Sequence, residues 1–257
     1  MSESKDIPLF QRSYPLLGES GIRYLRQAKV AVFGLGGVGS YTAEALARSG
    51  LGELYLIDKD VIEASNLNRQ LCALHSTIGQ AKVKVIRQRI QDINPAARVF
   101  CHELCYGPEL GLDFLPPDLD FIVDAIDDLR AKVDLICQAQ RGQIPIISAL
   151  GCGNKLDPTR FQVCDLYQTE NDPLARALRG RLRKAGIKSL DVVYSPEKPA
   201  FKDPQIISSL PYVPAIAGLY CAAHVVQAIS RVGTTDSIQE RQVKDRSQPQ
   251  TTEGRQG

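Results

Sequence analysis

Short apolar runs alternate with stretches of helical spacing through the first 150 residues of the chain. The apolar runs predict strands at residues 29–33, 53–57, 98–102, 121–126 and 144–148. Apolar side chains that recur every three or four positions predict helices at residues 38–49, 81–93 and 128–141. Because strands and helices alternate, right-handed crossovers would place the strands side by side. We therefore expect an α/β fold with a doubly wound, mainly parallel sheet.

The pattern changes after Gly151. Residues 161–166 alternate apolar and polar side chains, and residues 191–195 form another short run, so we expect an antiparallel or irregular extension of the sheet. Between them, Asp172-Pro173 begins a helix, because proline is favoured in a first turn. Residues 198–214 contain four prolines and are predicted to form a surface loop.

The longest apolar stretch is residues 213–229. It is short for a membrane span and carries polar residues, so we expect a buried helix and no membrane contact. From about residue 233 the chain is polar without apolar periodicity, which predicts a disordered tail at 233–257. The remainder, residues 1–232, is predicted to be one domain. Its nucleotide-binding half covers about 10–150 and its substrate half about 151–232.

The composition is typical of a globular protein. With 44% hydrophobic and 23% charged residues over 257 positions, it excludes collagen-like, coiled-coil and wholly disordered chains. A net charge of +2 does not by itself indicate a nucleic acid or a membrane as partner. The seven cysteines include no C-x-x-C pair, so we expect no structural zinc site. The polar first residues do not resemble a signal peptide, and we expect a cytoplasmic protein.

A glycine-rich turn follows the first predicted strand and precedes the first predicted helix. Residues 34–39 read G-L-G-G-V-G and fit the pattern G-x-G-x-x-G. Its glycines allow a tight turn and let backbone amides approach a phosphate at a helix N-terminus. Asp58 ends the next strand, where a carboxylate can accept hydrogen bonds from a ribose. This pattern alone fits NAD, FAD or ATP.

The residues after Asp58 favour a triphosphate. Arg69 and Lys82 add two cations, and Asp127 follows the strand at 121–126. A dinucleotide carries only a pyrophosphate, whereas two cations and a carboxylate at a strand end suit a triphosphate with Mg²⁺. Taken singly, Arg69 and Lys82 could be solvated, and Asp127 could cap the following helix.

Five segments together resemble the ThiF-type adenylating family, which includes sulfur-carrier adenylyltransferases and ubiquitin-activating enzymes. The segments are residues 34–39, 58–60, 65–70, 79–82 and 125–128. The resemblance runs from about Phe10 to Ile229. It implies binding of ATP with Mg²⁺ and transfer of AMP to a carboxylate.

The resemblance also implies roles for individual residues. Those implied to bind the nucleotide are Gly34, Gly36, Gly37, Gly39, Asp58, Asp60, Asn66, Asn68, Gln70 and Asp128. Those implied to act in catalysis are Arg12, Arg69, Lys82 and Asp127, with Asp127 as the Mg²⁺ ligand. Arg12 resembles an arginine that reaches the ATP of a partner subunit, which implies a homodimer.

The second half resembles one branch of this family, the tRNA threonylcarbamoyladenosine dehydratases. The similar segments are residues 151–159, 165–166, 172–176 and 193–197. This likeness implies a tRNA substrate modified beside the anticodon. The threonyl carboxylate would be adenylated with release of pyrophosphate. The neighbouring carbamoyl group would then close a ring and release AMP.

A basic run agrees with an anionic partner. It contains Arg176, Arg179, Arg181, Arg183 and Lys184 and no acidic residue. Like charges at neighbouring helical positions repel, so a tRNA backbone is a reasonable counterpart. A solvated basic face is the alternative.

Three other functions stay open. The acceptor could be the C-terminal glycine of a ubiquitin-like sulfur carrier. The chain could be an NAD-dependent oxidoreductase, or a nucleotide-gated module that serves a cysteine desulfurase. The isolated cysteines, including Cys72 and Cys152, are expected to be structural, because nothing near them indicates a lowered thiol pKa. Asp124 is expected to be a buried carboxylate outside the site.

Overall fold

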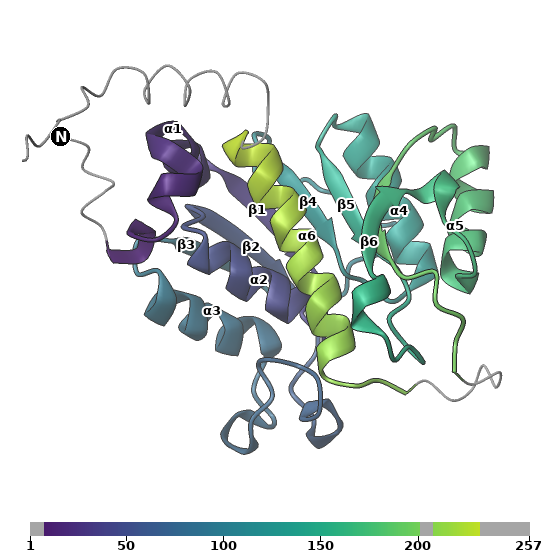
Figure 1. Cartoon of the computed structure of the whole chain (residues 1–257), viewed down its shortest axis with the longest axis horizontal. Coiled ribbons are helices and arrows are strands. Elements are labelled where there is room, and N and C mark those ends of the chain that lie inside the picture. Colours follow the sequence, from purple (N-terminus) through teal and green to yellow (C-terminus); the bar gives the residue numbers. More distant parts are fainter. Residues whose placement is uncertain (1–7, 201–207, 232–257) are drawn as a thin grey trace, which may run out of the picture.

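A seven-stranded sheet forms the centre of the computed structural model, which describes residues 8–200 and 208–231 (Figure 1). The strands are β1 (Lys29–Phe33), β2 (Glu53–Ile57), β3 (Arg98–His102), β4 (Phe121–Asp124), β5 (Ile146–Ala149), β6 (Gln162–Asp165) and β7 (Asp191–Tyr194). Their order is β3-β2-β1-β4-β5-β7-β6, and all pairs are parallel except β6 with β7. The predicted α/β class with an antiparallel extension is therefore confirmed.

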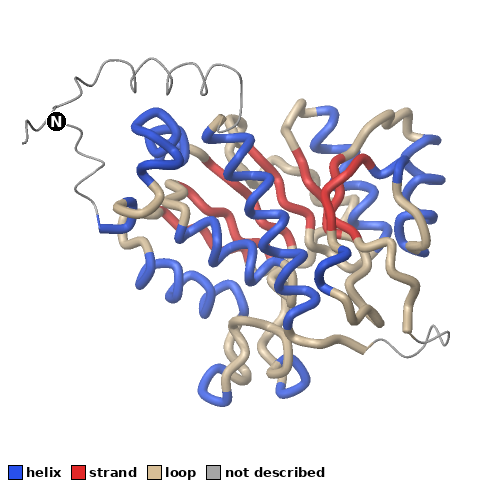
Figure 2. The backbone as a smooth tube through the Cα atoms, in the orientation of Figure 1, coloured by secondary structure: helices blue, strands red, loops and turns tan. Residues whose placement is uncertain are grey.

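Helices cover both faces of this sheet. They are α1 (Tyr14–Gln27), α2 (Gly39–Arg48), α3 (Lys82–Ile93), α4 (Leu129–Arg141), α5 (Pro173–Lys184) and α6 (Tyr212–Ser230). Short 3₁₀ turns lie at Pro8–Phe10, Ala64–Asn66, His75–Thr77, Pro158–Arg160 and Leu166–Gln168. Figure 2 shows α2, α3 and α6 lying across one face of the strands.

Side-chain alternation along the strands divides the core into two layers. In β1, Val30 and Val32 pack with α1, α2, α3 and α6, whereas Ala31 and Phe33 pack with α4 and α5. All four side chains are fully buried. This two-sided burial explains why the central strands read as continuous apolar runs rather than alternating ones.

Two differences from the predicted elements have a physical cause. The strand predicted at 121–126 ends at Asp124, because its carboxylate accepts a hydrogen bond from the Ile126 N–H and turns the chain. Helix α1 is absent from the sequence prediction. Gly18, with φ of 69°, interrupts its helical backbone and its apolar repeat.

The apolar stretch forms α6, which packs against α1 and α2. By length and composition it could cross a membrane, with a mean hydropathy of 1.5, a test that core helices of soluble proteins also pass. In the structure, 44% of the apolar part of this helix is buried, and Tyr212, Leu219 and Tyr220 are exposed. The predicted tail at 233–257 and part of the predicted loop at 198–214 lie outside the described residues.

Candidate active site

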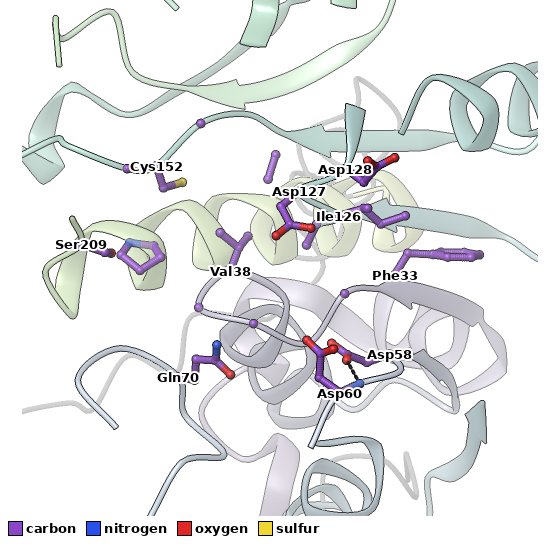
Figure 3. Close-up of a pocket in the computed structure, with 18 of the residues that line it drawn as sticks. Phe33, Val38, Asp58, Asp60, Gln70, Ile126, Asp127, Asp128, Cys152 and Ser209 are labelled. Atoms are coloured by element: carbon purple, nitrogen blue, oxygen red, sulfur yellow. Dashed lines mark hydrogen bonds between the residues drawn. The ribbon is translucent and has the colours of Figure 1, made fainter. Parts of the chain in front are cut away.

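A cavity of about 720 Å³ lies at the carboxyl ends of β1, β2, β4 and β5 (Figure 3). This is where the strand order reverses around β1 and β4, the usual place for a ligand in an open α/β sheet. Most of the predicted nucleotide and catalytic residues line it. They are Gly34, Gly36, Gly37, Asp58, Asp60, Asn66, Arg69, Gln70, Lys82, Asp127 and Asp128.

The turn between β1 and α2 needs glycine for two different reasons. Gly34 has φ of 83°, and a Cβ there would lie 2.6 Å from the carbonyl oxygen of Ala125. A Cβ at Gly39 would lie 1.8 Å from the carbonyl oxygen of Gly34. Glycine at these positions lets the turn close onto the end of β4. At Gly36 a Cβ would lie 3.8 Å from Gln70 Nε2, so this part of the turn leaves room for a ligand.

Asp58 holds a fixed orientation at the end of β2. Its Oδ2 accepts the Leu35 N–H at 2.6 Å, and its Oδ1 accepts the Asp60 N–H at 2.8 Å, the bond drawn in Figure 3. Each oxygen keeps a second lone pair. The carboxylate can therefore accept two neighbouring hydroxyls, as a ribose would present them.

Two cations are held in place beside it. Lys82, the first residue of α3, is buried, and its Nζ lies 2.8 Å from Asp60 Oδ2. Arg69 Nη1 donates to the carbonyl oxygen of Ser65 at 2.8 Å and to Asn68 Oδ1 at 2.9 Å. These contacts order both cations before a ligand binds, which suits stabilisation of phosphate charge.

The two carboxylates after β4 have different surroundings. Asp128 caps α4 by accepting the Ala131 N–H at 2.7 Å. The Asp127 side chain is exposed at the cavity, and Figure 3 shows it between the glycine turn and Cys152. The helix-capping alternative considered for Asp127 thus belongs to its neighbour.

A buried polar network lies beneath this segment. Asp124 Oδ2 accepts from Lys132 Nζ at 2.8 Å and from Ser148 Oγ at 2.6 Å, and Lys132 also donates to the carbonyl oxygen of Ala149 at 3.0 Å. Asp124, Lys132 and Ser148 have no exposed surface. Asp124 is buried as expected, but the ion pair was not predicted. Its one signal was a lysine in the apolar stripe of α4, in line with Ile136.

Some predicted residues lie elsewhere. The described residues that line the cavity do not include Arg12, Gly39 or Asn68. Arg12 is exposed in the turn before α1, and Asn68 Nδ2 donates to the carbonyl oxygen of Ser209. Gly39 packs against the carbonyl oxygen of Gly34 and so allows the turn to close. The sequence pattern alone could not separate these roles from ligand contact.

The basic run forms α5, and its members are not equivalent. Arg179 is half-buried and donates to the carbonyl oxygen of Thr169 at 2.8 Å, so it holds a loop. The sequence predicts that Arg179 contacts tRNA, whereas in the structure its guanidinium bonds to a carbonyl oxygen of the protein itself. The exposed cations of the helix are Arg176, Arg181, Arg183 and Lys184. The helix begins with Pro173 and Leu174, which line the cavity.

Other lining residues were missed by sequence reasoning. Lys155 and Asp172 are buried and lie in the cavity wall, brought there from the second half of the chain. Burial raises the pKa of the Cys152 thiol to about 12 and that of Cys72 to about 11. Both are therefore protonated near neutral pH, as expected for structural cysteines.

Comparison with known proteins identifies the family and supports the fold. A sequence profile of the ThiF family matches residues 10–253. The chain belongs to the ThiF family. This ThiF chain is similar to tRNA threonylcarbamoyladenosine dehydratase of Bacillus subtilis, with 40% identity over 92% of the chain and 98% of that relative.

A solved structure and a second relative distinguish between branches of the ThiF family. It is similar to the crystal structure of E. coli tRNA N6-threonylcarbamoyladenosine dehydratase in complex with ATP, with 35% identity and a TM-score of 0.82. The match covers 86% of this chain and 93% of that chain. The sulfur carrier protein adenylyltransferase of Thermus thermophilus is 34% identical, but over only 48% of this chain and 45% of its own. The ATP complex favours ATP over the NAD-dependent alternative.

Proposed function

We propose that this protein is an ATP-dependent dehydratase acting on threonylcarbamoyladenosine in tRNA. It adenylates the threonyl carboxylate with release of pyrophosphate, and ring closure then releases AMP. The observation that carries the proposal is the cavity in which Asp58, Lys82 and Asp127 converge within a ThiF chain. The similarity over nearly the full length of the Bacillus subtilis relative favours tRNA over a carrier protein as the acceptor.

The residues divide the work of adenylation. Asp58 accepts hydrogen bonds from the ribose hydroxyls, and the backbone N–H groups around Gly36 donate to phosphate oxygens. Arg69 and Lys82 neutralise the charge that develops on departing pyrophosphate. Attack by the threonyl carboxylate on the α-phosphate breaks the bond to the β-phosphate.

The donor set fits Mg²⁺ bound together with ATP. Mg²⁺ in such sites takes one or two carboxylates plus substrate phosphates, rather than a cage of protein ligands. Asp127 supplies a carboxylate at the cavity, and the described residues contain no group of three or more metal-ligating side chains. When bound, Mg²⁺ would neutralise phosphate charge, and Asp127 is the residue that would hold it.

Helix α5 is the proposed contact for the tRNA backbone. Its first turn lies at the cavity, and Arg176, Arg181, Arg183 and Lys184 extend along its exposed side. A modified base placed in the cavity would bring flanking phosphates toward these cations.

We also propose a homodimer and a cytoplasmic location. Arg12 is exposed and is not among the residues lining its own cavity, so an arginine finger at this position would have to serve a partner subunit. Tyr212, Leu219 and Tyr220 give α6 an exposed apolar face that a second subunit could cover. The unit proposed to act is residues 1–232. A cysteine desulfurase as a partner stays a prediction from the sequence.

Replacing Asp127 tests the proposal. Asp127→Ala should reduce AMP formation at least 100-fold, since it removes the proposed metal-holding carboxylate, while thermal stability stays near that of wild type. The measurement is AMP release from ATP with threonylcarbamoyladenosine-containing tRNA. Asp113→Ala, which changes an exposed aspartate that does not line the cavity, is the matched control and should keep wild-type activity.

Pyrophosphate exchange separates the possible acceptors. For the wild-type protein, exchange stimulated by modified tRNA supports the proposal. Exchange stimulated only by a ubiquitin-like carrier would establish the sulfur-carrier alternative. Bound ATP that never yields AMP with either acceptor would indicate a nucleotide-gated module.

A further inference from the structure

The cavity has a second wall that contains none of the predicted ATP contacts. It is formed by residues 151–155 and by the first turn of α5, at Asp172, Pro173 and Leu174. In Figure 3, Cys152 on this wall lies across the cavity from Asp58 and Asp60. The nucleotide contacts proposed above come from residues 34–128, so this wall faces the space left for the acceptor.

Asp172 is the carboxylate of this wall. It is 4% exposed. Its Oδ1 accepts the Ala175 N–H at 2.8 Å and caps α5. Its Oδ2 lies 3.7 Å from Lys155 Nζ and would lie 3.5 Å from a Cβ at Gly151. One oxygen therefore serves the helix, while the other lies over a glycine in the cavity wall.

Lys155 supplies the positive charge that a buried carboxylate requires. Its Nζ donates to the carbonyl oxygen of Ser195 at 2.5 Å and lies 3.4 Å from that of Glu197. Burial lowers the pKa of Lys155, and the Asp172 carboxylate opposes that change. These contacts hold the ammonium 3.7 Å from Asp172 Oδ2, so Lys155 and the helix cap together orient the carboxylate in the cavity wall.

Ring closure needs a proton acceptor at this place. A nitrogen or oxygen of the carbamoyl group forms a bond to the acyl carbon, and the bond from that carbon to the oxygen of AMP breaks. The bonding electrons leave with AMP. Whichever atom attacks, a carbamoyl N–H must lose its proton for the ring to be neutral, and a positioned base accelerates such a transfer.

The other acidic side chains that line the cavity belong to the nucleotide-binding segments; they are Asp58, Asp60, Glu63, Asp127 and Asp128. Both oxygens of Asp58 accept backbone N–H groups, and Asp60 pairs with Lys82. Asp127 is the proposed metal ligand. The raised pKa of Cys152, due to burial, leaves it a thiol. The described residues lining the cavity include no histidine.

We propose that Asp172 is the general base of the ring-closing step, with Lys155 as the residue that positions its carboxylate. Asp172 Oδ2 accepts the carbamoyl proton while AMP departs from the acyl carbon. This inference rests on the proposed function, because it concerns the second half of the same reaction. It assigns the two halves to opposite walls of one cavity.

The variant Asp172→Asn tests this role without removing the helix cap. Asparagine caps a helix as well as aspartate does, but it cannot accept the proton. We expect tRNA-stimulated pyrophosphate exchange within about threefold of wild type, with cyclic product formation slowed about 100-fold or more. Adenylated tRNA should accumulate and be detectable by mass spectrometry of its nucleosides.

A matched control and a second variant keep the test decisive. Asp157→Asn changes another N-cap aspartate, which accepts the Thr159 N–H outside the cavity, and should close the ring at the wild-type rate. Asp172→Ser also preserves a cap and should repeat the separation of the two steps if the asparagine variant folds poorly.

Two results would overturn the inference. One is wild-type ring closure by Asp172→Asn, and the other is an equal loss of exchange and ring closure in both folded variants. Failure of the proposed function looks different, because the wild-type protein itself would then show no exchange with modified tRNA.

Discussion

Helices α3 and α5 both begin at the cavity and both carry several cations, but they use them differently. On α3, Lys82 pairs with Asp60, Lys84 with Glu103 at 2.7 Å, and Arg89 with Glu44. On α5, Arg179 is bonded to loop carbonyls, and within the described residues no cation of this helix forms an ion pair.

The difference shows what a basic run in a sequence does not reveal. Three of the four cations of α3 pair with acids from α2 and from segments near β2 and β3, so they contribute to the scaffold and to one site. Within the part of the chain that the structure describes, no acidic side chain pairs with the cations of α5, although the last-turn cations are favoured by the helix dipole. An anionic ligand is the natural complement of α5 and not of α3.

The largest expected effect is at the buried start of α3. Lys82→Met should lower kcat for AMP formation about 100- to 1,000-fold, the usual loss when a preorganised charge-stabilising group is removed. Lys84→Met, two residues later and exposed, should change kcat less than twofold. Steady-state kinetics with modified tRNA measures both. Similar losses in the two variants would mean that α3 acts through its overall charge rather than through one side chain.

The exposed cations of α5 should affect tRNA alone. Arg181→Glu with Arg183→Glu should weaken tRNA binding about 10- to 100-fold at low salt and reduce the salt slope by about two, since each cation lost removes about one phosphate contact. The KM for ATP should not change. Filter binding at several salt concentrations measures the slope.

A charge-matched pair on α3 provides the control. Lys84→Glu with Arg87→Glu makes the same change in net charge and should leave tRNA affinity within about threefold of wild type. Equal weakening by both pairs would contradict the distinction between the helices and would indicate nonspecific attraction.

The smallest effect concerns the acid that neutralises α3. Burial raises the pKa of Glu44, but hydrogen bonds from Arg89 and Arg48 together lower it more, so it lies below its usual value. The stability from this ionised glutamate is complete above about pH 4.5 and is lost as pH falls through the folded-state pKa. The free energy of unfolding of Glu44→Gln should therefore be about 1 kcal/mol lower than that of wild type near neutral pH. This difference in stability should disappear below about pH 4.5. Thermal melts across that range would show it, and a gap that widens in acid would be inconsistent with this sign.

Sequence reasoning succeeded where local pattern and structure coincide. The strands at 29–33 and 53–57 match β1 and β2 residue for residue, because strands buried on both faces read as unbroken apolar runs. The glycine turn and Asp58 also lie where their spacing predicts. These features depend on neighbours within about 25 residues.

It failed where distant segments decide the outcome. Lys155 and Asp172 reach the cavity only through the order of β5, β7 and β6. The bonds of Arg179 to a loop and the pairing of Lys132 with Asp124 are equally invisible to periodicity. Asn68 shows the converse, since it lies within a predicted binding segment but not among the residues lining the cavity.

The charge pair between α4 and the end of β4 has a consequence for ligand affinity. With Lys132 joining Asp124, Ser148 and the carbonyl of Ala149 out of contact with solvent, the floor of the cavity takes its shape during folding. The entropy lost in ordering that floor therefore reduces the free energy released on folding, and it does not reduce the free energy released on nucleotide binding. A substitution at Lys132 would consequently lower the melting temperature and weaken ATP binding together, through residues that ATP never touches.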